Sequence, residues 1–206
     1  MNSRATDDIL KFWFGTTDIS TDIKKRDFWF NSTPEVDLDI TERYLSLYEE
    51  TKSIFGQTID DKWNVVPANM KDCLACIIVL DQFPRHIFRG RPLAYQTDEA
   101  ARFLSYFAQT YYAKRSISMW PTIFLYLPRE HSEDLRDHNK IPDQGHLRGK
   151  YRKQHREVLE KFGRYPHRND ILGRESTPEE LEYLRTGEHT WAKRILAHDF
   201  LRQDEE

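Results

Sequence analysis

Apolar residues recur at helical spacing along most of this chain. Val36, Ile40, Tyr44, Leu47 and Tyr48, for example, fall on one stripe of a helix. Alternating apolar and polar positions, which are typical of half-buried strands, are nearly absent, and there is no Asn-Gly or Asp-Gly hairpin signal. The pattern therefore predicts an all-α fold of antiparallel helical hairpins packed around a single core.

Glycines, prolines and capping residues indicate where the helices begin and end. Gly163 is placed as a C-terminal stop, and Thr177 with Glu180 can form a capping box at a helix start. Pro84 is expected to close one helix, and Pro128 is expected to open another. The sequence predicts helices over about residues 7–14, 33–56, 67–83, from 97, over 118–127, from 128, over 147–162, from 177 and over 189–201, with a loop at about 139–145.

Length and composition limit the class of protein. The chain has 206 residues, of which 38% are hydrophobic. This length predicts one domain over residues 1–206, with frayed ends at about 1–5 and 203–206. The apolar run from Cys73 to Leu80 is too short to cross a bilayer, and the N-terminus has no apolar signal core. We therefore expect a cytoplasmic protein with no membrane partner.

The charge balance argues against a nucleic-acid partner. The 31 basic and 34 acidic residues give a formal net charge of -3, so the chain as a whole does not attract polyanions. A locally basic stretch, His146 to Arg168, is interpreted as a solvated helix face.

Cys73 and Cys76 lie in an apolar helical run, and the sequence has no further ligands at the spacing of a zinc site. This favours buried, reduced cysteines. Nothing in the sequence indicates a cofactor or fixes the oligomeric state.

Three segments place a basic residue after an apolar helix end and a proline. In the first, Asp81 is expected at a helix C-terminus, where the helix dipole opposes its negative charge. Asp81 therefore needs a cationic partner, and Arg85 and Arg89 are local candidates. Together with Gln82, this group forms either an ion-pair lock that fixes the turn or the floor of an anion site.

The second segment follows an aromatic-rich stretch and combines acids with imidazoles. Glu130, His131 and Glu133 are candidates for acid–base chemistry. On a helix, His131, Asp134 and His138 could also face one way and bind a divalent metal. Histidines and carboxylates at helical spacing arise often by chance, so we expect no metal here.

The third segment gathers basic groups around one loop. Arg164, His167, Arg168, Asn169 and Arg174 lie close together in the sequence. The arginines could hold a phosphate or carboxylate bidentately, or they could tie the loop down through backbone carbonyls. The sequence leaves both interpretations open.

Familiar catalytic motifs are absent from the chain. There is no G-x-S-x-G, Walker A loop, Rossmann fingerprint or H-E-x-x-H, which excludes the hydrolases, nucleotide-binding proteins and zincins that depend on them. General acid–base chemistry and anion binding remain accessible.

These three segments resemble the signature blocks of the DUF924 family. The resemblance runs from about Ile9 to Leu184 and includes Phe12-Trp13-Phe14-Gly15 near the start. The blocks are Asp81-Gln82-Phe83-Pro84-Arg85 with Arg89-Gly90, Tyr126-Leu127-Pro128 with His131-Ser132-Glu133-Asp134-Leu135, and Phe162-Gly163-Arg164-Tyr165-Pro166-His167-Arg168-Asn169 with Leu172-Gly173-Arg174-Glu175-Ser176-Thr177-Pro178-Glu179-Glu180.

The resemblance implies a helical fold similar to the tetratricopeptide-like superhelices. It implies no reaction, because the family is named for having no known function. The chain departs from the usual family pattern at His138, where Gln is more common, and at His86, where Asn is more common. The first departure weakens the metal interpretation, since the relatives lack that ligand.

We expect a helical binding domain, arranged as a right-handed superhelix or a bundle, with an arginine-rich concavity for an anionic small molecule or an acidic peptide end. The alternative is a hydrolase or isomerase in which His131 or His167 is the general acid or base and Glu133 or Glu130 orients the imidazole. Developing negative charge would be stabilised by Arg85, Arg164 or Arg168. A third hypothesis is that the charged blocks only join helices. The candidate ligand-binding residues are Asp81, Gln82, Arg85, Arg89, Trp120, Glu130, Arg164, Arg168, Asn169 and Arg174.

Overall fold

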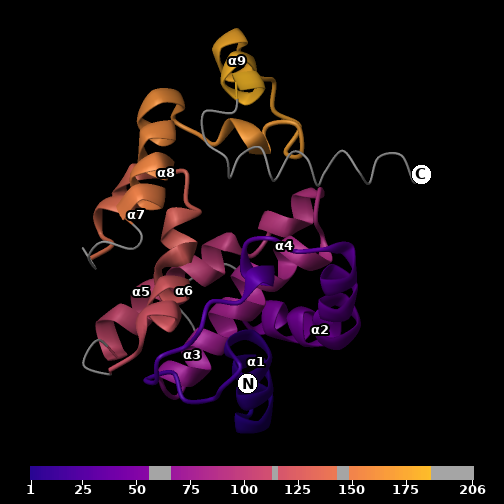
Figure 1. Ribbon diagram of the computed structural model, residues 1–206, viewed down its shortest axis with the longest axis vertical. Helices are drawn as coiled ribbons and strands as arrows, with labels where there is room; N and C mark the ends of the chain where they lie inside the picture. The colour runs from indigo at the N-terminus through magenta and orange to yellow at the C-terminus, as the bar shows by residue number, and fades with distance from the viewer. Residues whose placement is uncertain (56–65, 113–115, 143–148, 187–206) are drawn as a thin grey trace. The chain divides into compact units, whose positions relative to one another are not determined.

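Helices make up the regular secondary structure of the part that the structure describes (Figure 1). The computed structural model describes residues 1–55, 66–112, 116–142 and 149–186, and in these ranges every regular element is a helix. The predicted all-α class is therefore confirmed. Backbone contacts divide the chain into two compact units: unit 1 is Met1–Phe88 with Leu93–Arg129, and unit 2 is Arg89–Pro92 with Glu130–Glu206.

The first helix, α1 (Ser3–Phe14), begins earlier than the sequence pattern predicts and ends where it predicts. The side-chain oxygen of Asn2 accepts a hydrogen bond from the amide of Ala5 at 2.9 Å, which caps the helix start. Gly15 has a φ of 80°, and its amide donates to the carbonyl of Lys11. Glycine adopts this left-handed conformation without strain, so α1 stops at this point.

A 3₁₀ turn, η1 (Asp27–Trp29), leads into the longest described helix, α2 (Pro34–Phe55). This helix begins at the predicted first-turn proline. The stripe of Ile40, Tyr44 and Tyr48 is buried, as the helical spacing predicts.

The prediction that Pro84 closes the third helix is wrong. Helix α3 (Met70–Ile77) continues through a π-helical turn, η2 (Ile78–Gln82), into α4 (Phe83–Ile87), and Pro84 lies in the first turn of α4. Its ring is tolerated because it follows a π turn, where the ordinary helical hydrogen bonding is already interrupted.

The carbonyl that loses its partner to Pro84 is hydrogen-bonded from elsewhere. Proline has no amide hydrogen, so the carbonyl of Leu80, four residues earlier, receives no bond from it. Instead, the hydroxyl of Thr97 donates to that carbonyl at 2.6 Å, and both residues are buried. Thr97 thus compensates for the proline inside the helical run.

After the 3₁₀ turn η3 (Pro92–Tyr95), helix α5 (Asp98–Tyr112) starts at the predicted acidic residues. Helix α6 (Met119–Glu130) runs further than predicted and contains Pro128. The prediction that Pro128 opens a new helix is therefore wrong.

The described helices of unit 2 are short, apart from α8. Asp134 caps α7 through a hydrogen bond from the amide of Arg136. The stop at Gly163, which has a φ of 71°, is confirmed, whereas the helix predicted over 189–201 and the end of the loop predicted over 139–145 lie outside the described residues. The elements are α7 (Leu135–Asn139), α8 (Gly149–Phe162), η4 (Pro166–Arg168) and α9 (Pro178–Thr186).

Each unit has its own apolar cluster. In unit 1, α1 packs on α3, α2 on α4 and α3 on α5. The centre of this core is aromatic: the Trp13 ring lies 5.8 Å from Phe83 and 5.4 Å from Phe124 between centroids, both edge-on. Unit 2 has a smaller cluster, which consists of Val158, Leu159, Tyr165 and Tyr183.

Cys73 and Cys76 are free and buried in α3, which confirms the prediction of reduced core cysteines. Burial raises the pKa of both thiols, that of Cys76 to about 12. The Cys73 thiol donates to the carbonyl of Leu104 at 3.4 Å. Both cysteines therefore act as small apolar side chains and stay protonated.

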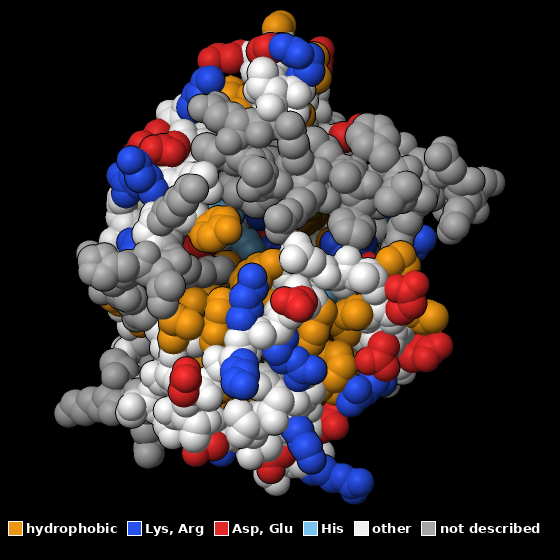
Figure 2. All heavy atoms as spheres, in the orientation of Figure 1, with side chains coloured by type: hydrophobic (Ala, Val, Ile, Leu, Met, Phe, Trp, Pro, Cys, Tyr) orange, Lys and Arg blue, Asp and Glu red, His pale blue; other side chains and the backbone are white. Residues whose placement is uncertain are grey.

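The surface carries charges of both signs. Figure 2 shows Lys and Arg side chains interspersed with Asp and Glu on the face it presents. The basic stretch on α8 is balanced locally, because Lys153 pairs with Glu157 and Arg156 with Glu160 one helical turn away. None of the helices in the described ranges has the length and apolar character needed to cross a bilayer.

Candidate functional site

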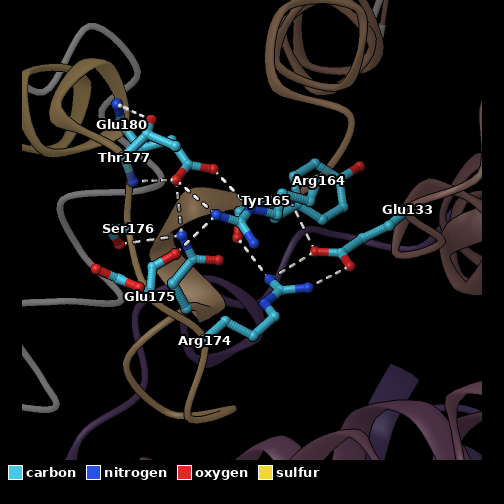
Figure 3. Close-up of polar contacts among 9 residues, drawn as sticks. Glu133, Arg164, Tyr165, Arg174, Glu175, Ser176, Thr177 and Glu180 are labelled. Atoms are coloured by element: carbon cyan, nitrogen blue, oxygen red, sulfur yellow. Dashed lines mark hydrogen bonds and ion pairs between the residues drawn. The ribbon is translucent and has the colours of Figure 1, made fainter.

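Glu133 and Arg174 form a bidentate ion pair in unit 2 (Figure 3). The two terminal nitrogens of Arg174 donate to Glu133 Oε2 at 2.7 Å and to Oε1 at 3.0 Å. The backbone amide of Tyr165 also donates to Oε1, at 2.7 Å. Burial alone would raise the pKa of Glu133, but the hydrogen bonds from Arg174 and Tyr165 outweigh it and lower that pKa. Glu133 is therefore ionised at neutral pH.

Arg164 and Glu180 form a second bidentate pair (Figure 3). Nε of Arg164 donates to Glu180 Oε1 at 2.7 Å, and Nη2 donates to Oε2 at 2.8 Å and to the carbonyl of Glu175 at 2.8 Å. The hydrogen bonds from Arg164 are the main reason that the pKa of Glu180 falls to about 2. Arg164 thus joins the end of α8 to the start of α9.

The predicted capping box of α9 is confirmed. The amide of Thr177 donates to Glu180 Oε2 at 2.8 Å, and the amide of Glu180 donates to the Thr177 hydroxyl at 3.2 Å. The side-chain amide of Asn169 adds hydrogen bonds to Ser176 Oγ at 3.0 Å and to Glu180 Oε2 at 3.2 Å. The same carboxylate therefore caps the helix and holds the preceding loop.

Three of the predicted ligand-binding residues thus bind the protein itself. Arg164, Asn169 and Arg174 connect the loop at 163–177 to α9 and to the turn that follows α6. Of the two interpretations that the sequence leaves open, the structure shows these residues tying the loop down, mainly through carboxylates and partly through carbonyls. Arg174 also donates to the carbonyl of Tyr165, at 3.1 Å.

Tyr165 lies at the centre of a group of imidazole and guanidinium side chains. Its ring is 5.8 Å from the ring of His155 and 5.5 Å from that of His167, between centroids. The guanidinium carbon of Arg168 lies 4.8 Å from the same ring centre, which is a cation–π distance. The Tyr165 hydroxyl donates to the carbonyl of Glu130 at 2.6 Å, so the ring that these groups share is fixed.

Burial and nearby titratable groups together lower the pKa of His167. His167 is buried, and burial is the main reason that its pKa lies well below the ordinary value. Arg168, His155 and His131 lower that pKa further, followed by Arg174. We call the group of Tyr165, His131, His155, His167, Arg168 and Arg174 the Tyr165 cluster.

Members of the cluster differ in their access to solvent. His167 and Arg168 are buried at 4% and 7% exposure, whereas His131 and His155 are partly exposed. Nδ1 of His155 is 2.8 Å from the carbonyl of Tyr151, one turn earlier on α8, so that nitrogen carries the proton and the ring is held in place. His131, His155 and Arg174, whose side chain is also partly exposed, are therefore the members that a solute can reach.

His138 is buried at one edge of the cluster. Its Nε2 lies 2.9 Å from the carbonyl of Ser132 and 3.4 Å from the Tyr165 hydroxyl, and burial lowers its pKa. Asp134 caps α7 and pairs with Arg136. Across the described residues, no group of three or more His, Cys, Asp or Glu side chains is placed to hold a metal ion.

Asp81, Gln82 and Arg85 of the first predicted segment belong to unit 1 and form an ion-pair network. Asp81 is fully buried, and its carboxylate accepts a hydrogen bond from Gln82. Arg85 lies 3.4 Å from Asp81 Oδ1 and 2.9 Å from Asp98 Oδ1. Burial alone would lower the pKa of Arg85, but these two carboxylates raise it above its ordinary value. The geometry is that of a lock across the π turn.

Three other candidates have different surroundings. The Trp120 ring packs on Trp29, 4.9 Å away between centroids, at the edge of the aromatic core. Glu130 is buried, and its carbonyl binds Tyr165. Arg89 is partly exposed and is grouped with unit 2 by its backbone contacts.

The sequence-based candidates include four members of the Tyr165 cluster, but not Tyr165 at its centre and not His155. Tyr165 was only part of a motif string, because an aromatic residue beside a proline is usually a core residue. His155 lay in a stretch interpreted as a solvated helix face. A signal for His155 was available in the sequence. His155 lies two helical turns before the apolar Phe162, so the two side chains share one face of α8.

Comparisons with known proteins agree on the fold and assign no activity. Residues 9–188 match the family described as "Bacterial protein of unknown function (DUF924)". The solved structure of the protein of unknown function ATU0120 from Agrobacterium tumefaciens is similar at 31% sequence identity and a TM-score of 0.73, over 90% of this chain and 99% of that one. No curated protein matches the chain.

Proposed function

The chain belongs to the DUF924 family, and from the Tyr165 cluster we propose that it is a helical binding domain for an anionic small molecule or an acidic peptide end. The observation that carries this proposal is the packing of Arg168 and two imidazoles on the ring of Tyr165. Guanidinium and imidazole groups gathered on one side chain create a local positive potential that an anion can satisfy.

The accessibility of the cluster supports the same proposal. His131 and His155 are partly exposed, while Arg168 is buried behind a fixed aromatic ring. An anion that contacts the exposed imidazoles would be attracted by the buried guanidinium, which loses little conformational entropy on binding because it is already ordered. In this proposal, Arg164 and Arg174 position the loop rather than contact the ligand.

The proposal also covers architecture and location. In unit 1, three helix pairs pack two places apart along the chain, α1 on α3, α2 on α4 and α3 on α5, which is a feature of stacked helical arrays. This supports a tetratricopeptide-like arrangement.

Two free, buried cysteines with raised pKa suit a reducing compartment, which supports a location in the cytoplasm.

One observation favours an enzyme as the second candidate. The lowered pKa of His167 leaves its imidazole neutral at neutral pH, the form that accepts a proton. Arg168 is close enough to stabilise developing negative charge. The described partners of Glu133 are Arg174 and the Tyr165 amide, so its carboxylate positions the loop and does not orient an imidazole.

Calorimetric titration with three anions tests the binding proposal. The probes are sodium sulfate, citrate and a short peptide that ends in two glutamates, at constant ionic strength. We expect wild-type protein to bind at least one probe, and Arg168→Gln and His155→Gln to weaken that binding by about tenfold or more. Lys153→Gln removes one positive charge from the exposed face of α8 and is expected to bind like wild type.

Two results would overturn the proposal. One is that wild type binds none of the probes, and the other is that Lys153→Gln weakens binding as much as Arg168→Gln does. Circular dichroism spectra of the variants establish that each has folded, and His155→Gln keeps the test valid if the buried Arg168 does not tolerate substitution. A variant His167→Gln that binds the anion normally but abolishes turnover of an ester or phosphate ester would favour the enzyme.

A further inference from the structure

Helix α2 carries an exposed stripe of leucines and glutamates that the packing of unit 1 does not use. Glu35, Leu38, Glu42, Leu45 and Glu49 are separated in turn by three, four, three and four positions, so they follow one line along the helix surface. All five are exposed, Leu38 at 58% and Leu45 at 38%. We call these five residues the Leu38 stripe.

The stripe lies on a different side of α2 from the residues that hold the helix in unit 1. The buried residues of α2 include Ile40, Tyr44 and Tyr48, and the helix packs on α4 and on the π turn η2. A single exposed leucine is common on protein surfaces and needs no explanation. Two leucines one heptad apart, with charged residues beside them, have the pattern of a seam on which a second helix packs.

The charge on the stripe is unbalanced. Helix α2 contains six acidic and two basic residues. Of the two basic residues, Lys52 lies 2.7 Å from Glu49, and Arg43 contacts acids outside the stripe. Neither Glu35 nor Glu42 has an ion-pair partner among the residues that the structure describes. The leucines are therefore exposed within a negatively charged surface.

This charge distinguishes between the possible occupants of the stripe. A second copy of the chain would bring an equally acidic surface against it, and like charges at an interface are unfavourable. In residues 187–206 of this chain, acidic residues outnumber basic ones, so that segment is not complementary either. A helix with leucines on one side and lysines or arginines beside them matches both the apolar and the charged groups of the stripe.

We propose that the Leu38 stripe is a docking surface for a basic amphipathic helix of a partner protein. Leu38 and Leu45 are about 10 Å apart along the helix axis, and leucines of the partner at the same spacing would pack beside them. Lysine or arginine side chains next to those leucines would reach the glutamates of the stripe. The surface lies in unit 1 and is independent of the Tyr165 cluster, which belongs to unit 2.

Fluorescence anisotropy with designed peptides tests this proposal on the 206-residue chain. The probe is a labelled peptide of about three heptads with leucine at the d positions, lysine at the a and e positions and alanine elsewhere. One control peptide has glutamate in place of every lysine. Another has the same composition in an order that spreads the leucines around the helix. We expect saturable binding of the basic amphipathic peptide, binding about tenfold weaker for the reordered peptide, and none for the acidic peptide.

Variants separate docking on the stripe from general attraction to an acidic protein. The double variant Leu38→Ala with Leu45→Ala is expected to bind the basic peptide about tenfold more weakly. Leu181→Ala, which shortens an exposed leucine of α9, is expected to bind like wild type. Glu42→Gln is expected to weaken binding about threefold, and Glu50→Gln, which removes an exposed charge of the same helix outside the stripe, is expected to have a smaller effect.

Several results would overturn the proposal. If the basic peptide does not bind wild type, or if the reordered peptide binds as tightly, the stripe is not a helix-docking surface. Wild-type affinity in the double leucine variant, with circular dichroism spectra that show it folded, would have the same meaning. A dimer of wild type in sedimentation equilibrium that the double variant abolishes would assign the stripe to a second copy. Tighter binding of a synthetic peptide of residues 187–206 would assign it to the chain itself.

Discussion

At the scale of single residues, partner choice decides what each charged side chain does. Three arginines that are close in sequence have different partners. Arg164 binds the carboxylate of Glu180, and Arg174 binds that of Glu133. Arg168 packs on the ring of Tyr165. An arginine has five donors and can reach carbonyls, carboxylates or aromatic faces. The sequence could therefore nominate these residues, but it could not say which ones brace the loop.

Glu180 provides a residue-scale prediction about pH and stability. The pKa of Glu180 is lowered to about 2 in the folded protein, below the value of about 4.3 in an unfolded chain. Its ionised form therefore stabilises the fold fully above about pH 5, and this stabilisation disappears as the pH falls towards about 2. Glu180→Gln is expected to lower the free energy of unfolding by roughly 1 to 2 kcal/mol at neutral pH.

Urea unfolding at a series of pH values checks this prediction. The difference between wild type and Glu180→Gln is expected to be constant above about pH 5 and to shrink at lower pH. Glu182→Gln is the matched control, because Glu182 is an exposed residue of the same helix that pairs only with Arg185 among the described residues. A difference that grows on acidification would contradict the role assigned to Glu180.

At the scale of elements, most helix boundaries followed from local signals. The starts of α2, α5 and α9 and the stops of α1 and α8 were predicted from capping residues, a first-turn proline and glycines. The two errors, at Pro84 and Pro128, both concern a proline inside a helical run. Proline usually ends a helix. At Pro84, the tertiary hydrogen bond from Thr97 to the carbonyl of Leu80 compensates, and such a contact has no local signal.

The hydroxyl of Thr97 is predicted to matter because of Pro84. Thr97→Val keeps the shape of the side chain but leaves the buried carbonyl of Leu80 without this donor. We expect the free energy of unfolding to fall by about 1 to 3 kcal/mol, measured by urea denaturation. Thr110→Val is the control, because the Thr110 hydroxyl bonds a carbonyl of its own helix at an exposed position. Equal losses in the two variants would argue against the compensating role of Thr97.

The left-handed stop of α8 gives a second prediction at this scale. Gly163 has a φ of 71° and nothing within 4 Å of an added Cβ, so Gly163→Ala introduces backbone strain without a steric clash. We expect a loss of about 1 kcal/mol in the free energy of unfolding. Gly149→Ala also meets nothing within 4 Å, and Gly149 has no positive φ, so this control is expected to be neutral or slightly stabilising. A neutral Gly163→Ala would show that this turn is not held in the left-handed conformation.

At the scale of the whole molecule, the sequence predicted the fold class and the family but not the centre of the site. The all-α class was predicted from the helical spacing of apolar residues. This spacing recurs in helix after helix, so many residues support the prediction. The Tyr165 cluster depends on η4, α8 and the loop at 163–177 folding against one ring. That arrangement is set by long-range packing, and no single stretch of sequence contains it.

The central claim is that the imidazoles around Tyr165 receive an anion. The most direct measurement is nitrogen-detected NMR of the histidine side chains during a titration of wild-type protein with sulfate at about pH 7. The account predicts that the signals of His131, His155 and His167 move together with one dissociation constant, while the signal of His86, which pairs with Asp37 in unit 1, stays in place. Sulfate binding that leaves these three signals unchanged, or that moves His86 equally, would contradict it.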